Sequence, residues 1–81
     1  SVISTGCTVG KGAEVIDSVI MPDVVIENGA SIRNAIIAEG CVIRAGAKIG
    51  GDVVNGERRI SVIGKEKEIS EGTVIEPGAI V

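Results

Sequence analysis

Four cationic side chains lie close together in the carboxyl half of the sequence. Arg58 and Arg59 follow Glu57, and Lys65 and Lys67 alternate with glutamates a few residues later. Arginine forks and lysine point charges are the groups that bind phosphate esters. We therefore predict a candidate phosphate or effector site at Arg58, Arg59, Lys65 and Lys67, whose two segments lie near the same corner of the fold if the chain between them folds back. The alternative is a solvated loop and strand with alternating charge.

Cys7 and Cys41 are the other reactive side chains, and they lie 34 residues apart. The two cysteines could form a redox pair or half of a metal site. The alternative is that they are simply small residues that fill buried corner positions. If the chain folds into stacked strands with a repeat of 17 residues, as argued below, the two cysteines lie two strand spacings apart, and their Cα atoms are separated by about 10 Å. This distance exceeds the roughly 7 Å that a disulfide spans. We predict two free thiols, which fit a cytoplasmic protein.

The composition excludes several kinds of site. The chain has no His, so the usual Ser-His-Asp, Cys-His and His-based metal sites are absent. It has no aromatic residue and a net charge of −3, so it lacks the stacking platforms and the basic stripe of nucleic-acid binding. Its apolar runs are too short to span a membrane. We expect no catalytic residue, no metal, no nucleic acid and no membrane partner.

A repeat of 17 residues must position these side chains. Val or Ile recurs at spacings of 6, 6 and 5 residues, at positions 3, 9, 15, 20, 26, 32, 37, 43 and 49, and again at 63, 69, 75 and 81. This period fits neither a helix nor a long alternating strand. It predicts short strands, three to a coil, stacked as an all-β parallel solenoid with these residues pointing inward.

Seven of the twelve glycines occupy one phase of the repeat, three residues after an inward position. We predict that they form corners with positive φ, a conformation that other residues resist. A small residue follows each corner glycine. The glycines are Gly6, Gly12, Gly29, Gly40, Gly46, Gly72 and Gly78, and the small residues are Cys7, Ala13, Ala30, Cys41, Ala47, Thr73 and Ala79.

The phase of the repeat breaks at residues 54–62, which contain Gly56 and three consecutive charges. We predict a loop inserted there at one corner of a continuing solenoid, with Val53 in a column with Val19 and Ile36.

Glu27 and Arg44 fall one repeat apart. This spacing predicts an exposed ion pair between neighbouring coils, which would contribute little to stability. Four to five coils make a rod about 20 Å long, whose open strand edges predict neighbours at its ends.

Hexads such as Val9-Gly-Lys-Gly-Ala-Glu14 resemble those of hexapeptide-repeat proteins, and this implies a single-stranded left-handed parallel β-helix with about 17 residues per coil. Longer stretches are similar to the carboxy-terminal domain of glucose-1-phosphate adenylyltransferase, also called ADP-glucose pyrophosphorylase. They are residues 17–26 (DSVIMPDVVI), 35–43 (AIIAEGCVI), 59–65 (RISVIGK) and 69–75 (ISEGTVI).

The resemblance implies that residues 1–81 form one β-helix domain of a longer chain whose catalytic nucleotidyltransferase domain is absent. That domain would make ADP-glucose and pyrophosphate from ATP and glucose 1-phosphate, with magnesium, for glycogen or starch synthesis. The β-helix would contribute assembly, typically as a homotetramer, and part of an allosteric site for sugar phosphates. Its partners would be its own catalytic domain and other subunits. The fragment alone would be inactive, and it would hold no cofactor of its own.

Lys65 aligns approximately with a lysine that contributes to activator binding in some members of that family. Ala38 and Glu39 stand where plant members carry a second effector lysine, so the effector is left open. Two alternatives also stay open: the β-helix domain of another sugar-phosphate nucleotidyltransferase, such as a mannose-1-phosphate guanylyltransferase, and a purely structural assembly solenoid. A self-contained hexapeptide-repeat acyltransferase would need a catalytic His, which this chain lacks.

Overall fold

The β-branched residues of each hexad form strands of two or three residues, separated by turns. The computed structural model describes residues 1–53 and 55–81, and its described part contains twelve strands. They are β1 (Val2–Ile3), β2 (Thr8–Val9), β3 (Glu14–Ile16), β4 (Val19–Ile20), β5 (Val25–Ile26), β6 (Ser31–Arg33), β7 (Ala35–Ile37), β8 (Val42–Ile43), β9 (Lys48–Gly50), β10 (Ser61–Ile63), β11 (Glu68–Ile69) and β12 (Val74–Ile75). No helix occurs in these residues.

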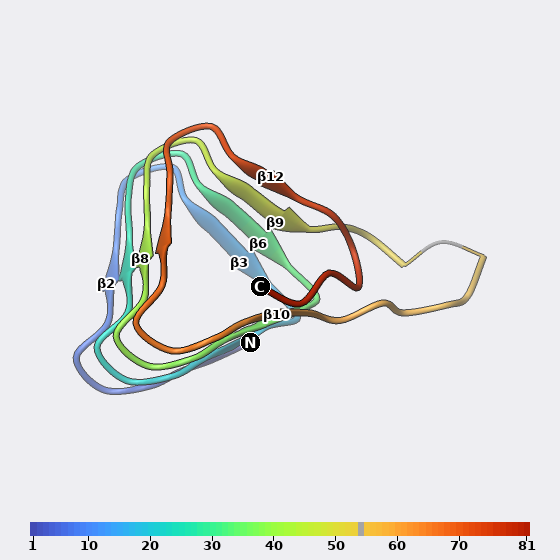
Figure 1. Ribbon diagram of the computed structural model, residues 1–81, viewed down its shortest axis with the longest axis horizontal. Helices are drawn as coiled ribbons and strands as arrows, with labels where there is room; N and C mark the ends of the chain where they lie inside the picture. Colours follow the sequence, from blue (N-terminus) through green and yellow to red (C-terminus); the bar gives the residue numbers. More distant parts are fainter. Residues whose placement is uncertain (54) are drawn as a thin grey trace.

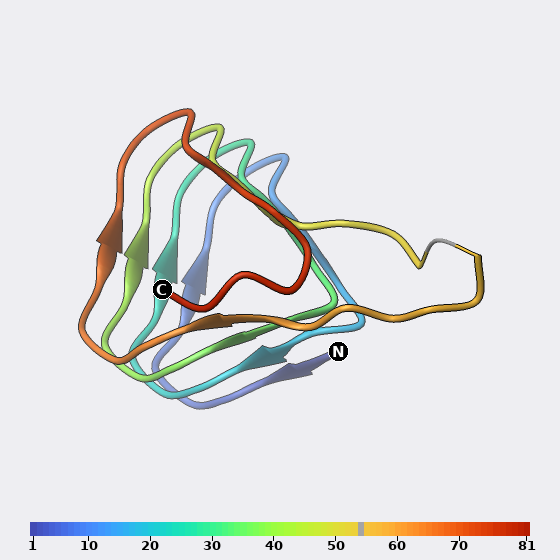
Figure 2. The same cartoon turned by 45° about the vertical axis from the view of Figure 1, so that its right-hand side comes forward.

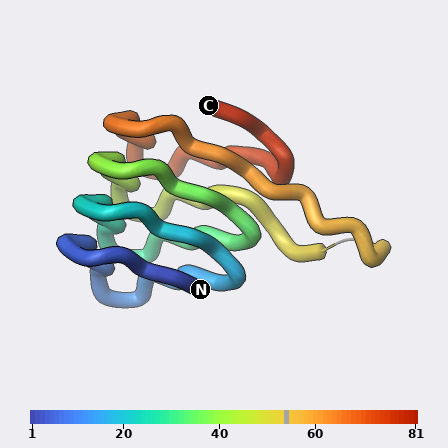
Figure 3. The backbone as a smooth tube through the Cα atoms, turned by 90° about the horizontal axis from the view of Figure 1, so that it is seen from below, coloured from blue at the N-terminus to red at the C-terminus, as the bar shows by residue number. Residues whose placement is uncertain are grey.

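The strands assemble into three parallel sheets that form the sides of a triangular prism (Figure 1). Sheet A has the order β1-β4-β7-β10, sheet B β2-β5-β8-β11 and sheet C β3-β6-β9-β12. Each coil passes once through A, B and C, and four coils stack, as the tube in Figure 3 shows. In Figure 1 the chain runs clockwise as it advances from the fainter amino-terminal coil toward the viewer. The predicted all-β, left-handed parallel β-helix is therefore confirmed.

The core is a set of three inward columns, one for each sheet. Ile3, Ile20, Ile37 and Ile63 stack in sheet A, and the inward residues of sheets B and C stack in the same way. Six of the predicted inward positions are confirmed by side chains that are 0% exposed: Ile20, Ile26, Ile32, Ile37 and Ile43 in the second and third coils, and Ile63 in the fourth. Ile3 is 46% exposed and Val9 42%, because no coil lies below the first one.

The corners also follow the prediction, since all seven glycines of the corner phase have positive φ. One corner shows how strongly the fold imposes this conformation. Asp23 and Glu66 occupy the same place in their coils as Gly6 and Gly40, and they too have positive φ, at 61° and 57°. Side chains at these two positions accept a conformation that costs about 1–2 kcal/mol per residue.

The inserted loop lies earlier than predicted. It spans residues 51–60 rather than 54–62, and Val54 lies outside the described residues. Ser61 and Val62 belong to β10, where Ser61 pairs with Ala35 and Val62 with Ile36. Val62, not Val53, therefore continues the column of Val19 and Ile36. The inward residues recur with the same spacing up to Ile49 and again from Ile63. This pattern shows that residues are inserted between the two positions, but it does not fix where the loop begins and ends.

The loop leaves the prism at the corner between sheets C and A and projects away from it (Figures 1 and 2). The principal extents of the molecule are 34 × 22 × 20 Å, and the 20 Å axis is the one down which the coils superpose. Ile80 pairs with Val62 and begins a fifth level over sheet A.

In the described part of the chain, no helix has the length and apolar character needed to cross a membrane.

Candidate functional site

The chain leaves the prism for the loop at Gly50, the last residue of β9. Gly50 has a φ of 73°, whereas Ile16 and Arg33, its partners in the same column, do not have positive φ. A Cβ on Gly50 would collide with the carbonyl oxygen of Arg33. Only glycine allows the backbone of coil 3 to turn outward this close to coil 2.

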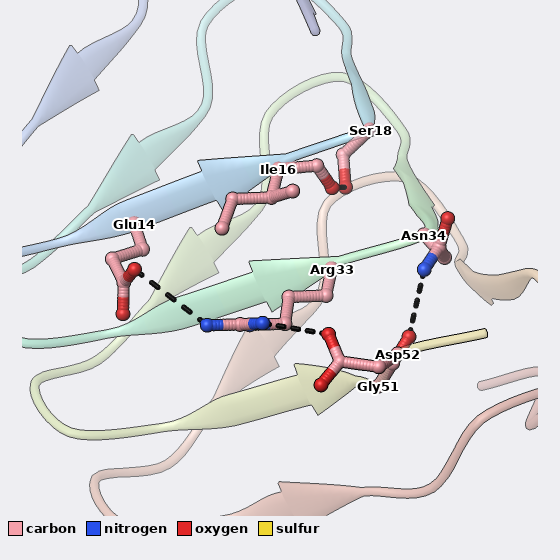
Figure 4. Close-up of polar contacts among 7 residues, drawn as sticks. All are labelled: Glu14, Ile16, Ser18, Arg33, Asn34, Gly51 and Asp52. Carbon is pink, nitrogen blue, oxygen red and sulfur yellow. Dashed lines mark hydrogen bonds and ion pairs between the residues drawn. The ribbon is translucent and has the colours of Figure 1, made fainter. Parts of the chain in front are cut away.

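Arg33 holds the first residues of the loop against the prism (Figure 4). Its Nη1 donates a hydrogen bond to Oδ1 of Asp52 at 2.6 Å, and its Nη2 lies 3.6 Å from Oε2 of Glu14. One guanidinium thus joins coil 1 to the loop across coil 2. The hydrogen bond with Asp52 raises the pKa of Arg33, and the charges of Asp52 and Glu14 raise it further.

Asn34 provides a second contact to the loop. The residue is 4% exposed, and its Nδ2 donates to the carbonyl oxygen of Gly51 at 2.8 Å (Figure 4). Its φ is 48°, and it forms the one-residue turn between β6 and β7; Asp17 has the same φ in the connection one coil earlier. Asn34 therefore links a turn of the prism to the start of the loop.

An open cavity of about 460 Å³ lies between the loop and the fourth coil. Three carboxylates, an amide, a guanidinium and a proline line it: Asp52, Asn55, Glu57, Arg59, Glu76 and Pro77. The Nε of Arg59 lies 3.5 Å from Oε1 of Glu57. A Cβ on Gly78 would lie 3.5 Å from Cβ of Arg59, so the arginine passes beside the last corner of the chain.

The structure does not bring the four predicted cations to one corner. Arg58 and Arg59 lie in the loop, which precedes β10 at the corner of sheets C and A, and Lys65 and Lys67 follow β10 at the corner of sheets A and B. The expectation of a single shared corner is wrong because β10 separates the two pairs. Arg59 also faces carboxylates in the cavity, which disfavours an anion there. Phosphate binding by Lys65, Lys67 or Arg58 stays a prediction.

Three residues that hold the first part of the loop, Arg33, Asn34 and Asp52, were not predicted from the sequence. One signal was present: Arg33 stands in the column of Gly50, next to the break in the repeat. The partner of Arg33 depends on the path of the loop, which the column pattern does not give.

A second ion-pair network lies on the outer side of sheet B. The predicted pair is confirmed, since Nη1 of Arg44 donates to Oε2 of Glu27 at 2.9 Å. Its Nε also donates to Oε2 of Glu68 in the next coil at 2.9 Å. These hydrogen bonds, with Glu68 first, raise the pKa of Arg44. The other carboxylate oxygen of Glu27 accepts from the backbone N–H of Ala45 at 3.1 Å. One side chain from each of three coils is thereby tied together.

Both cysteines are free thiols, as predicted. Cys41 is fully buried, and its Sγ donates to the carbonyl oxygen of Gly64 at 3.0 Å. Cys7 makes the same contact two coils earlier, to the carbonyl oxygen of Met21 at 3.1 Å. The two side chains therefore fill equivalent corner positions.

Comparison with known protein families matches residues 1–69 to the family described as GlmU-like, C-terminal hexapeptide. The match spans the first three coils, the loop and the fourth coil as far as β11. No curated protein and no solved structure matches the chain. Hexapeptide domains of this type are typical of sugar nucleotidyltransferases.

Proposed function

The chain belongs to the family of GlmU-like C-terminal hexapeptide domains, and from this premise we propose that it is the assembly and regulatory domain of a nucleotidyltransferase that makes ADP-glucose. The reaction joins ATP and glucose 1-phosphate and releases pyrophosphate. The family match carries the nucleotidyltransferase part of the proposal. The similarity of residues 17–26, 35–43, 59–65 and 69–75 to ADP-glucose pyrophosphorylase supports the choice of nucleotide and sugar.

On this proposal the chemistry, with its magnesium, belongs to a separate catalytic domain in the cytoplasm, and the β-helix acts on that domain through its placement. A sugar-phosphate effector that bridges the β-helix and the catalytic domain favours one arrangement of the two. It changes activity only by its difference in affinity between arrangements. Lys65 and Lys67 are exposed at one corner, and Arg58 is exposed in the projecting loop, so each is accessible to a neighbouring domain.

The first test measures pyrophosphate release by the full-length protein. ATP with glucose 1-phosphate is compared with GTP and mannose 1-phosphate, each with and without a panel of sugar phosphates. We expect turnover that depends on ATP and rises with one sugar phosphate. A preference for GTP and mannose 1-phosphate would instead favour a mannose-1-phosphate guanylyltransferase.

The regulatory part is tested by substitution. We expect Lys65→Ala to weaken activation several-fold and leave the basal rate unchanged, because the ammonium contacts the effector and not the substrates. Lys48→Ala is the matched control, since Lys48 is an exposed lysine on sheet C, away from that corner. If Lys65→Ala and Arg58→Ala both leave activation unaltered, the effector site is elsewhere and the domain serves assembly alone.

A further inference from the structure

Two of the three asparagines in the sequence precede a glycine, at Asn28-Gly29 and at Asn55-Gly56. An asparagine loses its amide nitrogen most readily in this dipeptide, because the glycine has no side chain that obstructs the approach of its backbone nitrogen to the carboxamide. The attack of that nitrogen on Cγ closes a five-membered imide ring. The sequence does not distinguish the two dipeptides, whereas the structure does.

The Asn28-Gly29 pair is held by hydrogen bonds between coils. Oδ1 of Asn28 accepts from the backbone N–H of Lys11 at 2.9 Å, and the N–H of Gly29 donates to the carbonyl oxygen of Lys11 at 3.1 Å. A Cβ on Gly10 would lie 2.5 Å from Oδ1 of Asn28, so the first coil also packs closely against the carboxamide. The attacking nitrogen and the carboxamide that it must reach are therefore both held by the first coil, and ring closure has to break both hydrogen bonds.

The Asn55-Gly56 pair is exposed in the loop that projects from the prism (Figure 2). Within residues 1–53 and 55–81, neither the carboxamide of Asn55 nor the N–H of Gly56 has a hydrogen-bond partner. A Cβ on Gly56 would meet nothing within 4 Å in the same part of the chain. The two φ angles are 54° and 73°, with the positive sign that both central residues of a type I′ turn have. Rotation of this pair toward ring closure breaks no hydrogen bond of the described residues.

We propose that Asn55 is a site of spontaneous modification, at which the loop exchanges a carboxamide for a carboxylate. The backbone nitrogen of Gly56 attacks Cγ of Asn55 and gives up its proton. The bond from Cγ to the amide nitrogen breaks, and this nitrogen leaves with that proton as ammonia. One water molecule then opens the imide. Cleavage between the ring nitrogen and Cγ gives aspartate, and cleavage between the ring nitrogen and the main-chain carbonyl carbon gives isoaspartate.

The modification changes the charge of the cavity between the loop and the fourth coil. Asn55 lines this cavity together with three carboxylates and one guanidinium, those of Asp52, Glu57, Glu76 and Arg59. The product adds a fourth carboxylate, so the modified cavity disfavours an anion more strongly and favours a cationic group. Isoaspartate also lengthens the main chain of the loop by one carbon atom. This change lies outside the three sheets, so the stacking of the coils is retained.

The test incubates the folded full-length protein in mildly alkaline buffer, which promotes loss of the proton from the attacking nitrogen. Trypsin then releases residues 49–58, which contain Asn55, and residues 12–33, which contain Asn28. We expect residues 49–58 to gain the mass that replaces an amide by a carboxyl group, in two products of equal mass that separate by chromatography. Residues 12–33 should convert at least about tenfold more slowly, because their ring closure breaks two hydrogen bonds.

Two controls test the chemistry and the role of the fold. Asn55→Gln would have to close a six-membered ring, so residues 49–58 of this variant should keep their mass. The same incubation in denaturant removes the hydrogen bonds from Lys11, and Asn28 and Asn55 should then convert at similar rates.

The proposal is overturned if Asn55 keeps its amide in the folded protein. It is also overturned if the product is aspartate alone, since direct hydrolysis gives aspartate without an imide. Equal rates at Asn28 and Asn55 in the folded protein would refute the selection of the loop site. Resistance of Asn28 in denaturant would show that the hydrogen bonds between coils do not protect it, and the structural reason for selecting Asn55 would fall. None of these outcomes depends on the reaction that the full-length protein catalyses.

Discussion

Gly50 shows how one residue decides where the coil opens. Its φ of 73° turns the chain out of the prism, and its α-hydrogen faces the carbonyl oxygen of Arg33 in the neighbouring strand. That oxygen belongs to the backbone of β6, which pairs with β9 in register. The neighbour cannot move aside without disturbing this pairing, so any side chain at position 50 must shift the strand.

We predict that Gly50→Ala destabilises the fold more than Gly46→Ala does. Gly46 has a similar φ of 69°, but a Cβ there meets nothing within 4 Å among the described residues. Gly46→Ala should therefore cost only the left-handed conformation, about 1–2 kcal/mol. Gly50→Ala adds a backbone clash and should cost at least about 3 kcal/mol.

Denaturant unfolding of the two alanine variants measures this difference. Gly46→Ala is the control for conformation alone. Equal losses of free energy of unfolding would show that strand β9 can shift freely, and the close approach to Arg33 would then have no energetic role.

At the scale of elements, the loop is an addition to a coil that closes without it. In coils 1 and 2 one or two residues join sheet C to sheet A: Asp17 and Ser18 lie between β3 and β4, and Asn34 alone lies between β6 and β7. Asp17 and Asn34 both have a φ of 48°. In coil 3 residues 51–60 replace this short connection. The β10 strand still pairs with β7 in the register that the earlier coils use.

We predict that replacing residues 51–60 by one Asn leaves the fold intact. The shorter connection lowers the entropy cost of closing the chain by up to about 2 kcal/mol. The lost exposed pair between Arg33 and Asp52 is worth at most about 1 kcal/mol. The free energy of unfolding should therefore stay equal or rise. A scrambled loop of the same length that keeps Gly51 and Asp52 is the control, and loss of the β signal in circular dichroism would contradict the prediction.

The repeat in the sequence predicts most of this architecture. The inward columns, the seven corner glycines, the free thiols and the pair of Glu27 with Arg44 follow from spacing, because stacking in register converts a distance of 17 residues into a contact. The loop was misplaced because an insertion leaves the inward phase unaltered on both sides. The small buried residues locate it: Ser18, Ala35 and Ser61 share one column. The contacts of Arg33 and Asn34 depend on the loop's path, which no period encodes.

At the scale of the molecule, stability is distributed along the stack rather than around one centre. Each coil contacts only the coils above and below it, so the middle coils have neighbours on both sides and the first has one. Exposure follows this order in sheet A, from 46% at Ile3 to 0% at Ile20, Ile37 and Ile63. The edges of β1, β2 and β3 leave backbone groups unpaired at one end of the described stack.

We therefore predict a gradient in the cost of equivalent core deletions. Ile37→Ala removes a fully buried side chain between two coils and should cost about 2–5 kcal/mol, as buried Ile-to-Ala changes do. Ile3→Ala removes a half-exposed side chain of the same column, and the cavity it leaves is open to water, so it should cost about 1 kcal/mol or less. Denaturant unfolding of both variants in the 81-residue chain gives the two values. Equal costs would mean that the first coil is buried in solution, and that the end of the stack pairs with another copy.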